Sequence, residues 1–189
     1  IRLIEKIPAD SFIVRLDADE YLDPEFLLRI NNILNIKKNT QLILSIRNKA
    51  YYFLLKYMNK SFRILFLILW GNVFAHGSST FSKSLYKKVG GYTPYVYFSQ
   101  DYVLWVNMLL NTDLVFFNYK DVFIPKEIKN IETISNKFRN EQIIFSFFSI
   151  SLLTNHLFNR RRNLFINIFH WSLVLISIIF KTMRNILKL

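Results

Sequence analysis

Cysteine is absent from the 189-residue chain, which excludes disulfide bonds, thiolate metal sites and a cysteine nucleophile. Glycine and proline are scarce, with four of each, so we expect few tight turns and long helices. Acidic residues are also few, because 13 Asp and Glu accompany 25 Lys and Arg and leave a net charge of +12. That surplus favours phosphate-bearing or anionic partners.

Apolar residues are abundant, at 52% of the chain with 17% aromatic, which is more than a soluble domain usually carries. The length suits one domain with an appendage. Near the C-terminus, however, the apolar run from Leu164 to Phe180 has only 17 residues and contains polar breaks. A bilayer span needs about 20 mainly apolar residues.

Basic residues flank that run, at 160–162 and again at Lys181, Arg184 and Lys188. This layout favours a helix lying among anionic headgroups over a true span. We therefore expect 141–189 to be a helical, membrane-associating extension, peripheral or monotopic, with one transmembrane span as the less favoured form. A helical subdomain packed on the core is the alternative.

The rest of the chain alternates helical and strand patterns, as α/β domains do. Asp23-Pro24-Glu25 predicts a helix start, and Leu27, Ile30, Ile33 and Leu34 are its expected apolar face. The segment 79–92 suggests a short strand, a short helix and a Gly-Gly turn. The remaining predicted elements are helices ending near residue 6, over 24–35, within 50–72 and over 99–111, and strands at 12–16, at 40–48 and within 113–127.

The stretch FIVRLDADEYLD places four acidic residues directly after an apolar strand, namely Asp17, Asp19, Glu20 and Asp23. Ligands of parallel α/β sheets bind beyond the carboxyl ends of the strands. A hard divalent cation takes oxygen ligands and would relieve the repulsion among these carboxylates. The simpler interpretation is a solvated loop in which Asp23 caps the next helix.

Three further motifs follow in order, namely His76-Gly77-Ser78 with Lys83, Gly90-Gly91-Tyr92, and Gln100-Asp101-Tyr102-Val103-Leu104-Trp105. The whole set resembles the family 2 glycosyltransferases of GT-A fold, which are bacterial enzymes that build cell-surface polysaccharides. The resemblance covers roughly residues 1–140. It implies a partial GT-A sheet with helices, on the cytoplasmic face of the plasma membrane.

The resemblance implies a role for each site residue. Asp19 would bind Mn²⁺ or Mg²⁺ bridging the diphosphate of a nucleotide-sugar donor, and Asp17 would support the donor site. Asp101 would be the general base for a saccharide or lipid-linked acceptor, in an inverting transfer. An N-cap role for Asp101 in the helix that follows is the structural alternative. His76 would contact the donor, and a purely structural role is weighed equally.

The sequence departs from the family pattern in three ways. Gln100 stands where the family has an acid, and 125–135 offers only Lys126 and Lys129 in place of an Arg or His group. The family's first strand, its Pro-x-(Tyr/Phe)-Asn turn and its base-binding stretch are missing. We therefore expect 1–140 to be the C-terminal part of a GT-A domain, or alternatively a non-catalytic remnant or membrane-bound accessory subunit. A nucleic-acid binder is disfavoured because no recognised motif appears.

Overall fold

The computed structural model of the protein describes most of the first 119 residues and a few positions beyond them. The described residues are 2–16, 21–75, 77–94, 96–97, 99–119, 122–123, 172, 175–176, 179 and 183.

Helices and strands alternate along the described chain, as the sequence predicts. The helices are α1 (Arg2–Lys6), α2 (Phe26–Ile36), α3 (Lys49–Tyr57), α4 (Lys60–Trp70), α5 (Lys83–Lys88) and α6 (Gln100–Asn111). The strands are β1 (Phe12–Val14), β2 (Tyr21–Leu22), β3 (Leu42–Ile46), β4 (Thr80–Ser82), β5 (Val115–Tyr119) and β6 (Val122–Phe123).

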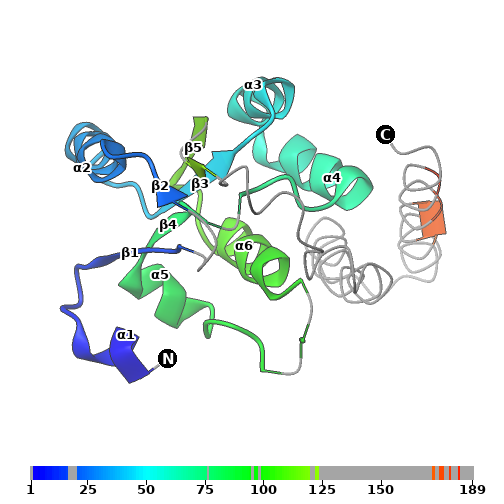
Figure 1. Ribbon diagram of the computed structural model, residues 1–189. Helices are drawn as coiled ribbons and strands as arrows, with labels where there is room; N and C mark the ends of the chain where they lie inside the picture. The colour runs from blue at the N-terminus through cyan, green and yellow to red at the C-terminus, as the bar shows by residue number, and fades with distance from the viewer. Residues whose placement is uncertain are drawn as a thin grey trace.

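Four strands form one mixed sheet in the order β1-β4-β3-β5 (Figure 1). β4 pairs antiparallel with both β1 and β3, whereas β3 and β5 are parallel. β1, β3 and β5 therefore all point the same way. A second, two-stranded antiparallel ribbon joins β2 to β6. The α/β class is confirmed, and the sheet is mixed rather than purely parallel.

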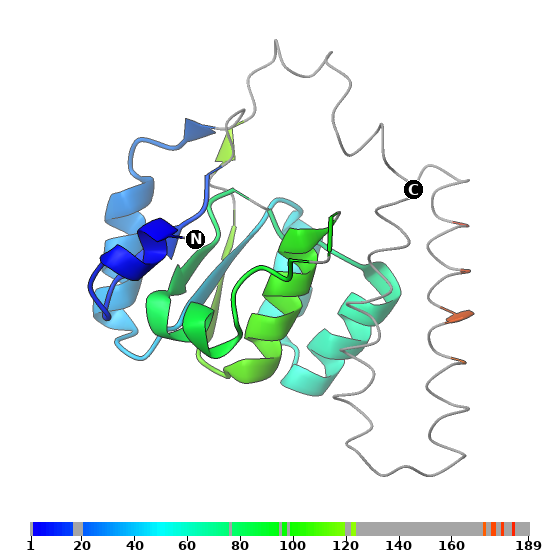
Figure 2. The same ribbon diagram turned by 90° about the horizontal axis from the view of Figure 1, so that it is seen from below.

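Helices cover both faces of the sheet, with α2 on one side and α4 and α6 on the other (Figure 2). The side chains of β3 alternate between the two faces, as a strand's period of two requires. Ile43 packs with Phe26 and Ile30 of α2. Leu42, Leu44 and Ile46 belong instead to the larger cluster, which includes buried residues of α3, α4, α5 and α6.

The helix expected from residue 24 begins at Phe26, after a turn whose Asp23 Oδ1 accepts the Glu25 N–H at 2.9 Å. Glu25 occupies the N-cap position without a capping hydrogen bond from its side chain, and Asp23 Oδ1 bonds the amide of that residue rather than one inside the helix, so the predicted cap at Asp23 was wrong. The expected apolar face was wrong at Leu27, which is 64% exposed, whereas Phe26 is only 1% exposed. Phe26 and Ile30 are four residues apart and so share the inward face.

The strand predicted at 12–16 is shorter and less buried than its apolar sequence suggests. β1 covers Phe12–Val14, lies at an edge of the four-stranded sheet and is half-buried. A strand with one neighbour has an uncovered side, which a local apolar pattern does not reveal. The other predicted strands and helices are confirmed, with 50–72 forming two helices, α3 and α4, and 113–127 containing two strands, β5 and β6.

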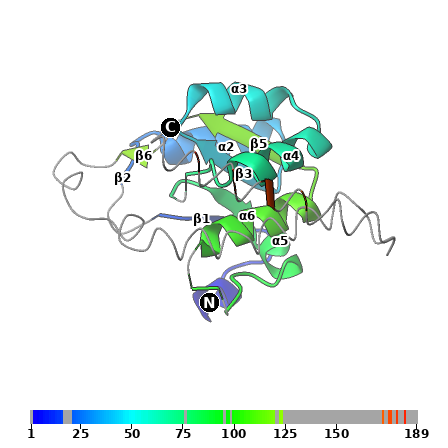
Figure 3. The ribbon, with the colours of Figure 1, turned by 90° about the vertical axis from the view of Figure 1, so that its right-hand side faces the viewer.

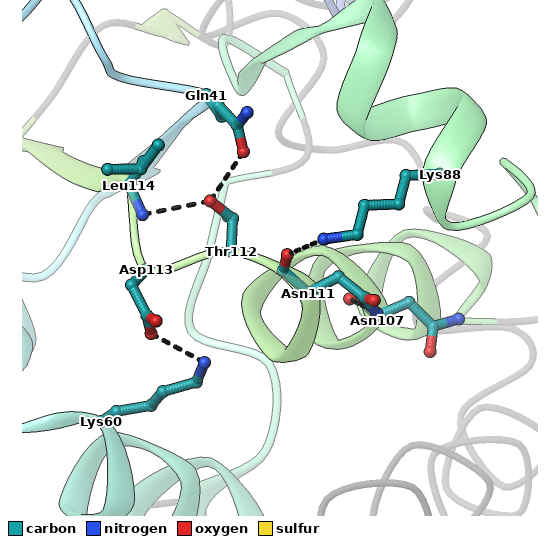
Figure 4. Close-up of polar contacts among 8 residues, drawn as sticks. All are labelled: Gln41, Lys60, Lys88, Asn107, Asn111, Thr112, Asp113 and Leu114. Atoms are coloured by element: carbon teal, nitrogen blue, oxygen red, sulfur yellow. Dashed lines mark hydrogen bonds and ion pairs between the residues drawn. The ribbon is translucent and has the colours of Figure 1, made fainter.

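The C-terminal end of α6 is fastened to its surroundings by polar contacts (Figure 4). Lys88 Nζ donates to the carbonyl oxygen of Asn111 at 2.7 Å, which satisfies a terminal carbonyl of the helix. Thr112 Oγ1 donates to Gln41 Oε1 at 2.8 Å and accepts the Leu114 N–H at 3.1 Å. These contacts hold the C-terminal end of α6 against the start of β3. Because a helix is stiff, they also help to position the N-terminal end of α6.

The membrane-associating extension predicted at 141–189 lies almost entirely outside the described residues. Among the residues that are described, no helix has the length and apolar content needed to cross a bilayer.

Candidate functional site

The parallel strands β1, β3 and β5 all finish at the same end of the sheet. We call this end the carboxyl edge, which is not the edge strand β1, and define it by Arg15, Ile46 and Tyr119. Ile46 lies opposite Tyr119 in the parallel register. Arg15 directly follows β1, and its N–H donates to the Ser79 carbonyl at 3.0 Å. Phe74 bridges to Ile46 and brings the chain after α4 to the same place. Ligands of α/β sheets bind at such an edge.

Asp101 lies in the first turn of α6 and is tied to the carboxyl edge through Asn72. The Asn72 Nδ2 amide donates to Asp101 Oδ2 at 3.0 Å, and Asn72 Oδ1 accepts the Phe74 N–H at 3.1 Å. Asp101 is only partly buried. Within the described part of the chain, its other oxygen, Oδ1, accepts no hydrogen bond. The contact with Asn72 therefore orients one oxygen of the carboxylate.

The N-cap interpretation of Asp101 is wrong. The helix starts one residue earlier, at Gln100, and Ser99 occupies the N-cap position without a capping hydrogen bond from its side chain. Asp101 is consequently inside the helix, where a carboxylate near the N-terminus still interacts favourably with the helix dipole. Its side chain is used for contact with Asn72 and not for capping.

Arg15 and Tyr92 form a second polar pair at this edge. The Arg15 guanidinium donates to the Tyr92 hydroxyl at 2.9 Å, and its carbon lies 5.6 Å from the centre of the ring. Burial raises the pKa of Tyr92 above 10.0, the Arg15 charge lowers it, and the nearby Asp101 carboxylate raises it further. Tyr92 thus stays neutral at physiological pH, between a cation and an anion.

Two serines at this edge hold the left-handed backbone conformation that favours glycine. Ser78 has φ 62° and Ser99 has φ 56°, and they are the non-glycine residues with positive φ in the described part of the chain. Ser78 is fully buried, and its N–H donates to the Arg15 carbonyl at 2.7 Å. Ser99 precedes α6. Such strain costs about 1–3 kcal/mol per residue and concentrates at functional sites.

Three of the predicted site residues, Asp17, Asp19 and His76, lie outside the described residues, as do Lys126 and Lys129. Their described chain neighbours Leu16 and Ala75 can be placed. Leu16 follows Arg15, and the Ala75 N–H donates to the carbonyl of Ser45 in β3 at 2.8 Å. The chain therefore enters both undescribed stretches from the carboxyl edge.

Other motif residues have structural roles. Leu104 and Trp105 are fully buried, as core residues are. Lys83 is 5% exposed, and its ammonium donates to the Glu5 carbonyl at 3.1 Å and to the Ile7 carbonyl. It closes the end of α1 and points away from the carboxyl edge. Within the described ranges, no three His, Asp or Glu side chains converge as a metal site would require.

Comparison with protein-family models gives no match, and comparisons with curated proteins and with solved structures give none either.

Arg15, Asn72 and Tyr92 were not predicted as members of the site, although each carries a signal in the sequence. Arg15 is a charged residue within the apolar stretch 12–16 that predicts a strand, and a charge that becomes buried needs a partner. Asn72 follows the glycine that ends α4. Tyr92 belongs to the Gly-Gly-Tyr motif, in which the two glycines predict a turn and the tyrosine follows directly after it.

Proposed function

We propose that the chain belongs to a glycosyltransferase that moves a sugar from a nucleotide-diphospho-sugar to a saccharide or lipid-linked acceptor. The observation that carries the proposal is the Asp101 carboxylate, held by Asn72 at the carboxyl edge with one oxygen accepting no hydrogen bond from the described residues. A general base needs such an oriented, accessible oxygen. The ordered motifs and the strained serines beside them add support.

In the proposed reaction, the acceptor hydroxyl attacks the anomeric carbon of the donor as Asp101 takes its proton. A new glycosidic C–O bond forms, the bond from the anomeric carbon to the diphosphate breaks, and the nucleoside diphosphate leaves with the electron pair. Asn72 would keep the base oriented, and the cation of Arg15 would favour the anionic donor at this edge. Attack from the face opposite the leaving group inverts the anomeric centre.

Asp19 is the proposed ligand of Mn²⁺ or Mg²⁺, with Asp17 and His76 on the donor. When bound there, the metal would neutralise charge on the departing diphosphate. These assignments rest on the motif resemblance alone.

The test is the turnover of UDP-, GDP- and dTDP-hexoses by the complete gene product that contains this sequence, measured as release of nucleoside diphosphate. Asp101→Asn keeps the shape of the side chain but cannot accept a proton. We expect kcat to fall by about 10²–10⁴, with KM for the donor and the melting temperature near wild type.

Asp113→Asn is the matched control. Asp113 follows the other end of α6, a 12-residue helix that is about 18 Å long, and its carboxylate pairs with Lys60 at 2.7 Å. We expect this variant to turn over donor normally. A wild-type rate in Asp101→Asn would remove Asp101 from the mechanism, and absence of turnover by the wild type with every donor would overturn the transferase proposal.

A further inference from the structure

The helical hairpin of α3 and α4 exposes large apolar side chains that the fold leaves uncovered. The two helices are joined by two residues and lie next to each other (Figures 1 and 3). We call the exposed set the hairpin patch. Its members are Phe53 at 45% exposed, Leu54 at 44%, Tyr57 at 74% and Phe62 at 59%. Large exposed apolar patches rimmed by polar residues mark interaction sites.

Lysines are interleaved with these apolar side chains. Lys49, Phe53 and Tyr57 follow one another at four-residue spacing and so share one face of α3. Lys56 is also exposed, and its ammonium lies 5.4 Å from the ring centres of both Tyr52 and Tyr57. The Tyr52 hydroxyl, and after it Tyr57, raises the pKa of Lys56, so the ammonium stays charged at neutral pH.

No acidic residue occurs from Arg47 to Asn72, so nothing in the hairpin offsets its positive charge. Two of the basic residues there already have protein partners. Lys60 pairs with Asp113, and Arg63 donates to the Leu55 carbonyl at 2.7 Å. Lys49 and Lys56 remain the charges on the exposed face of α3. An apolar, aromatic surface edged by such lysines complements a partner surface whose outer layer is anionic and whose interior is apolar.

We propose that the hairpin patch binds the surface of an anionic lipid bilayer, with the aromatic rings at the level of the headgroups and Lys49 and Lys56 on the lipid phosphates. Aromatic side chains favour this depth because they have an apolar body and, in Tyr, a polar tip. Short helices that lie in the interface need no bilayer-spanning length. The proposal does not depend on the transferase chemistry or on the C-terminal segment.

Apolar exposure alone does not distinguish the hairpin patch, because α2 exposes Leu27 and Leu28 at 64% and 60%. What differs is the charge beside them. The adjacent Arg29 lies 2.8 Å from Asp23 and 3.9 Å from Glu25, so acidic residues just before α2 offset its charge. This surface is similar in apolar exposure but lacks the unopposed lysines, and it supplies the matched control.

The experiment is flotation of the full chain with vesicles of phosphatidylcholine, with and without phosphatidylglycerol. We expect binding to the anionic vesicles and little to the neutral ones. The double variant Lys49→Gln/Lys56→Gln should weaken partitioning about 25-fold, because each lysine near an anionic surface contributes about fivefold. Phe53→Ser/Tyr57→Ser should also weaken it, whereas Leu27→Ser/Leu28→Ser should bind as the wild type does.

Circular dichroism and size-exclusion chromatography on the same variants would show that they fold and whether they self-associate. Wild-type partitioning by both hairpin variants would overturn the proposal, as would a wild type that fails to float with anionic vesicles. A change of oligomeric state with unchanged flotation would identify the patch as a contact between copies of the chain and would equally overturn it. Loss of hexose turnover leaves these outcomes unaffected.

Discussion

Tyr92 is the residue at which the electrostatics of the candidate site can be measured directly. Its hydroxyl accepts from Arg15, its environment includes the Asp101 carboxylate, and much of the ring is buried. Burial is the largest cause of its raised pKa. The two charges act on it in opposite directions, so each can be removed separately.

We predict that Asp101→Asn lowers the pKa of Tyr92, because it removes a negative charge that disfavours the phenolate. Arg15→Gln should raise the pKa of Tyr92, because it removes the positive charge that favours the phenolate. Both shifts can be read as the alkaline rise in phenolate absorbance, after subtraction of the same titration in Tyr92→Phe. If neither variant moves that component, Arg15 and Asp101 are not beside Tyr92 in solution.

The same raised pKa has a consequence for stability. A group that binds its proton more tightly when folded contributes stability below its unfolded pKa and loses it as pH rises through the folded value. For Tyr92 that loss begins above pH 10.0. We expect the urea midpoint of Tyr92→Phe to decline less steeply with pH in this range than that of the wild type.

At the scale of the element, the turn after α5 shows two neighbouring glycines with different constraints. Gly90 has φ +79° and nothing within 4 Å of the position a Cβ would take. Gly91 has φ +70°, and a Cβ there would lie 2.6 Å from the Tyr86 ring. Tyr86 in turn stacks on Phe81 and meets the edge of Tyr92. The second glycine is therefore required for packing as well as for backbone conformation.

We predict that Gly90→Ala costs about 1–2 kcal/mol of unfolding free energy, from the left-handed backbone alone. Gly91→Ala should cost about 1–3 kcal/mol more, because the added methyl group displaces the Tyr86 ring. Urea denaturation of the two variants measures the difference. Equal losses would mean that Tyr86 moves aside freely and that only the backbone term matters.

At the scale of the whole molecule, the sheet separates two apolar clusters that share no side chain. Ile30 belongs to the cluster beneath α2, and Ile64 belongs to the larger one on the opposite face. Both are buried, at 4% and 3% exposed. Any interaction between the two clusters therefore has to pass through the strands of the sheet.

We predict that Ile30→Val and Ile64→Val each lower the unfolding free energy by about 0.5–1.5 kcal/mol. The double variant should lose the sum to within about 0.5 kcal/mol, since distant sites without shared partners are additive. A double-mutant cycle in urea provides the measurement. A larger coupling would show that the sheet transmits repacking from one face to the other.

Most elements could be predicted from the sequence because their causes are local. The apolar period places α6, Gly71 ends α4, and the apolar run 42–46 forms β3. The side chain of Asp23 accepts the N–H of Glu25 two residues along, in the turn before α2. Asp101 could be singled out because its motif is contiguous. Each of these features involves residues that interact within about one or two helical turns.

Strand pairing and the candidate site were decided by the tertiary structure. No local pattern states that β4 runs antiparallel between β1 and β3, or that β1 has one neighbour in the sheet. Asn72 reaches Asp101 across 29 residues and Arg15 reaches Tyr92 across 77. The sequence by itself determined which segments become helices and strands and which motifs they carry. Which side chains meet depends on how those elements pack, because burial and pairing act across space and not along the chain.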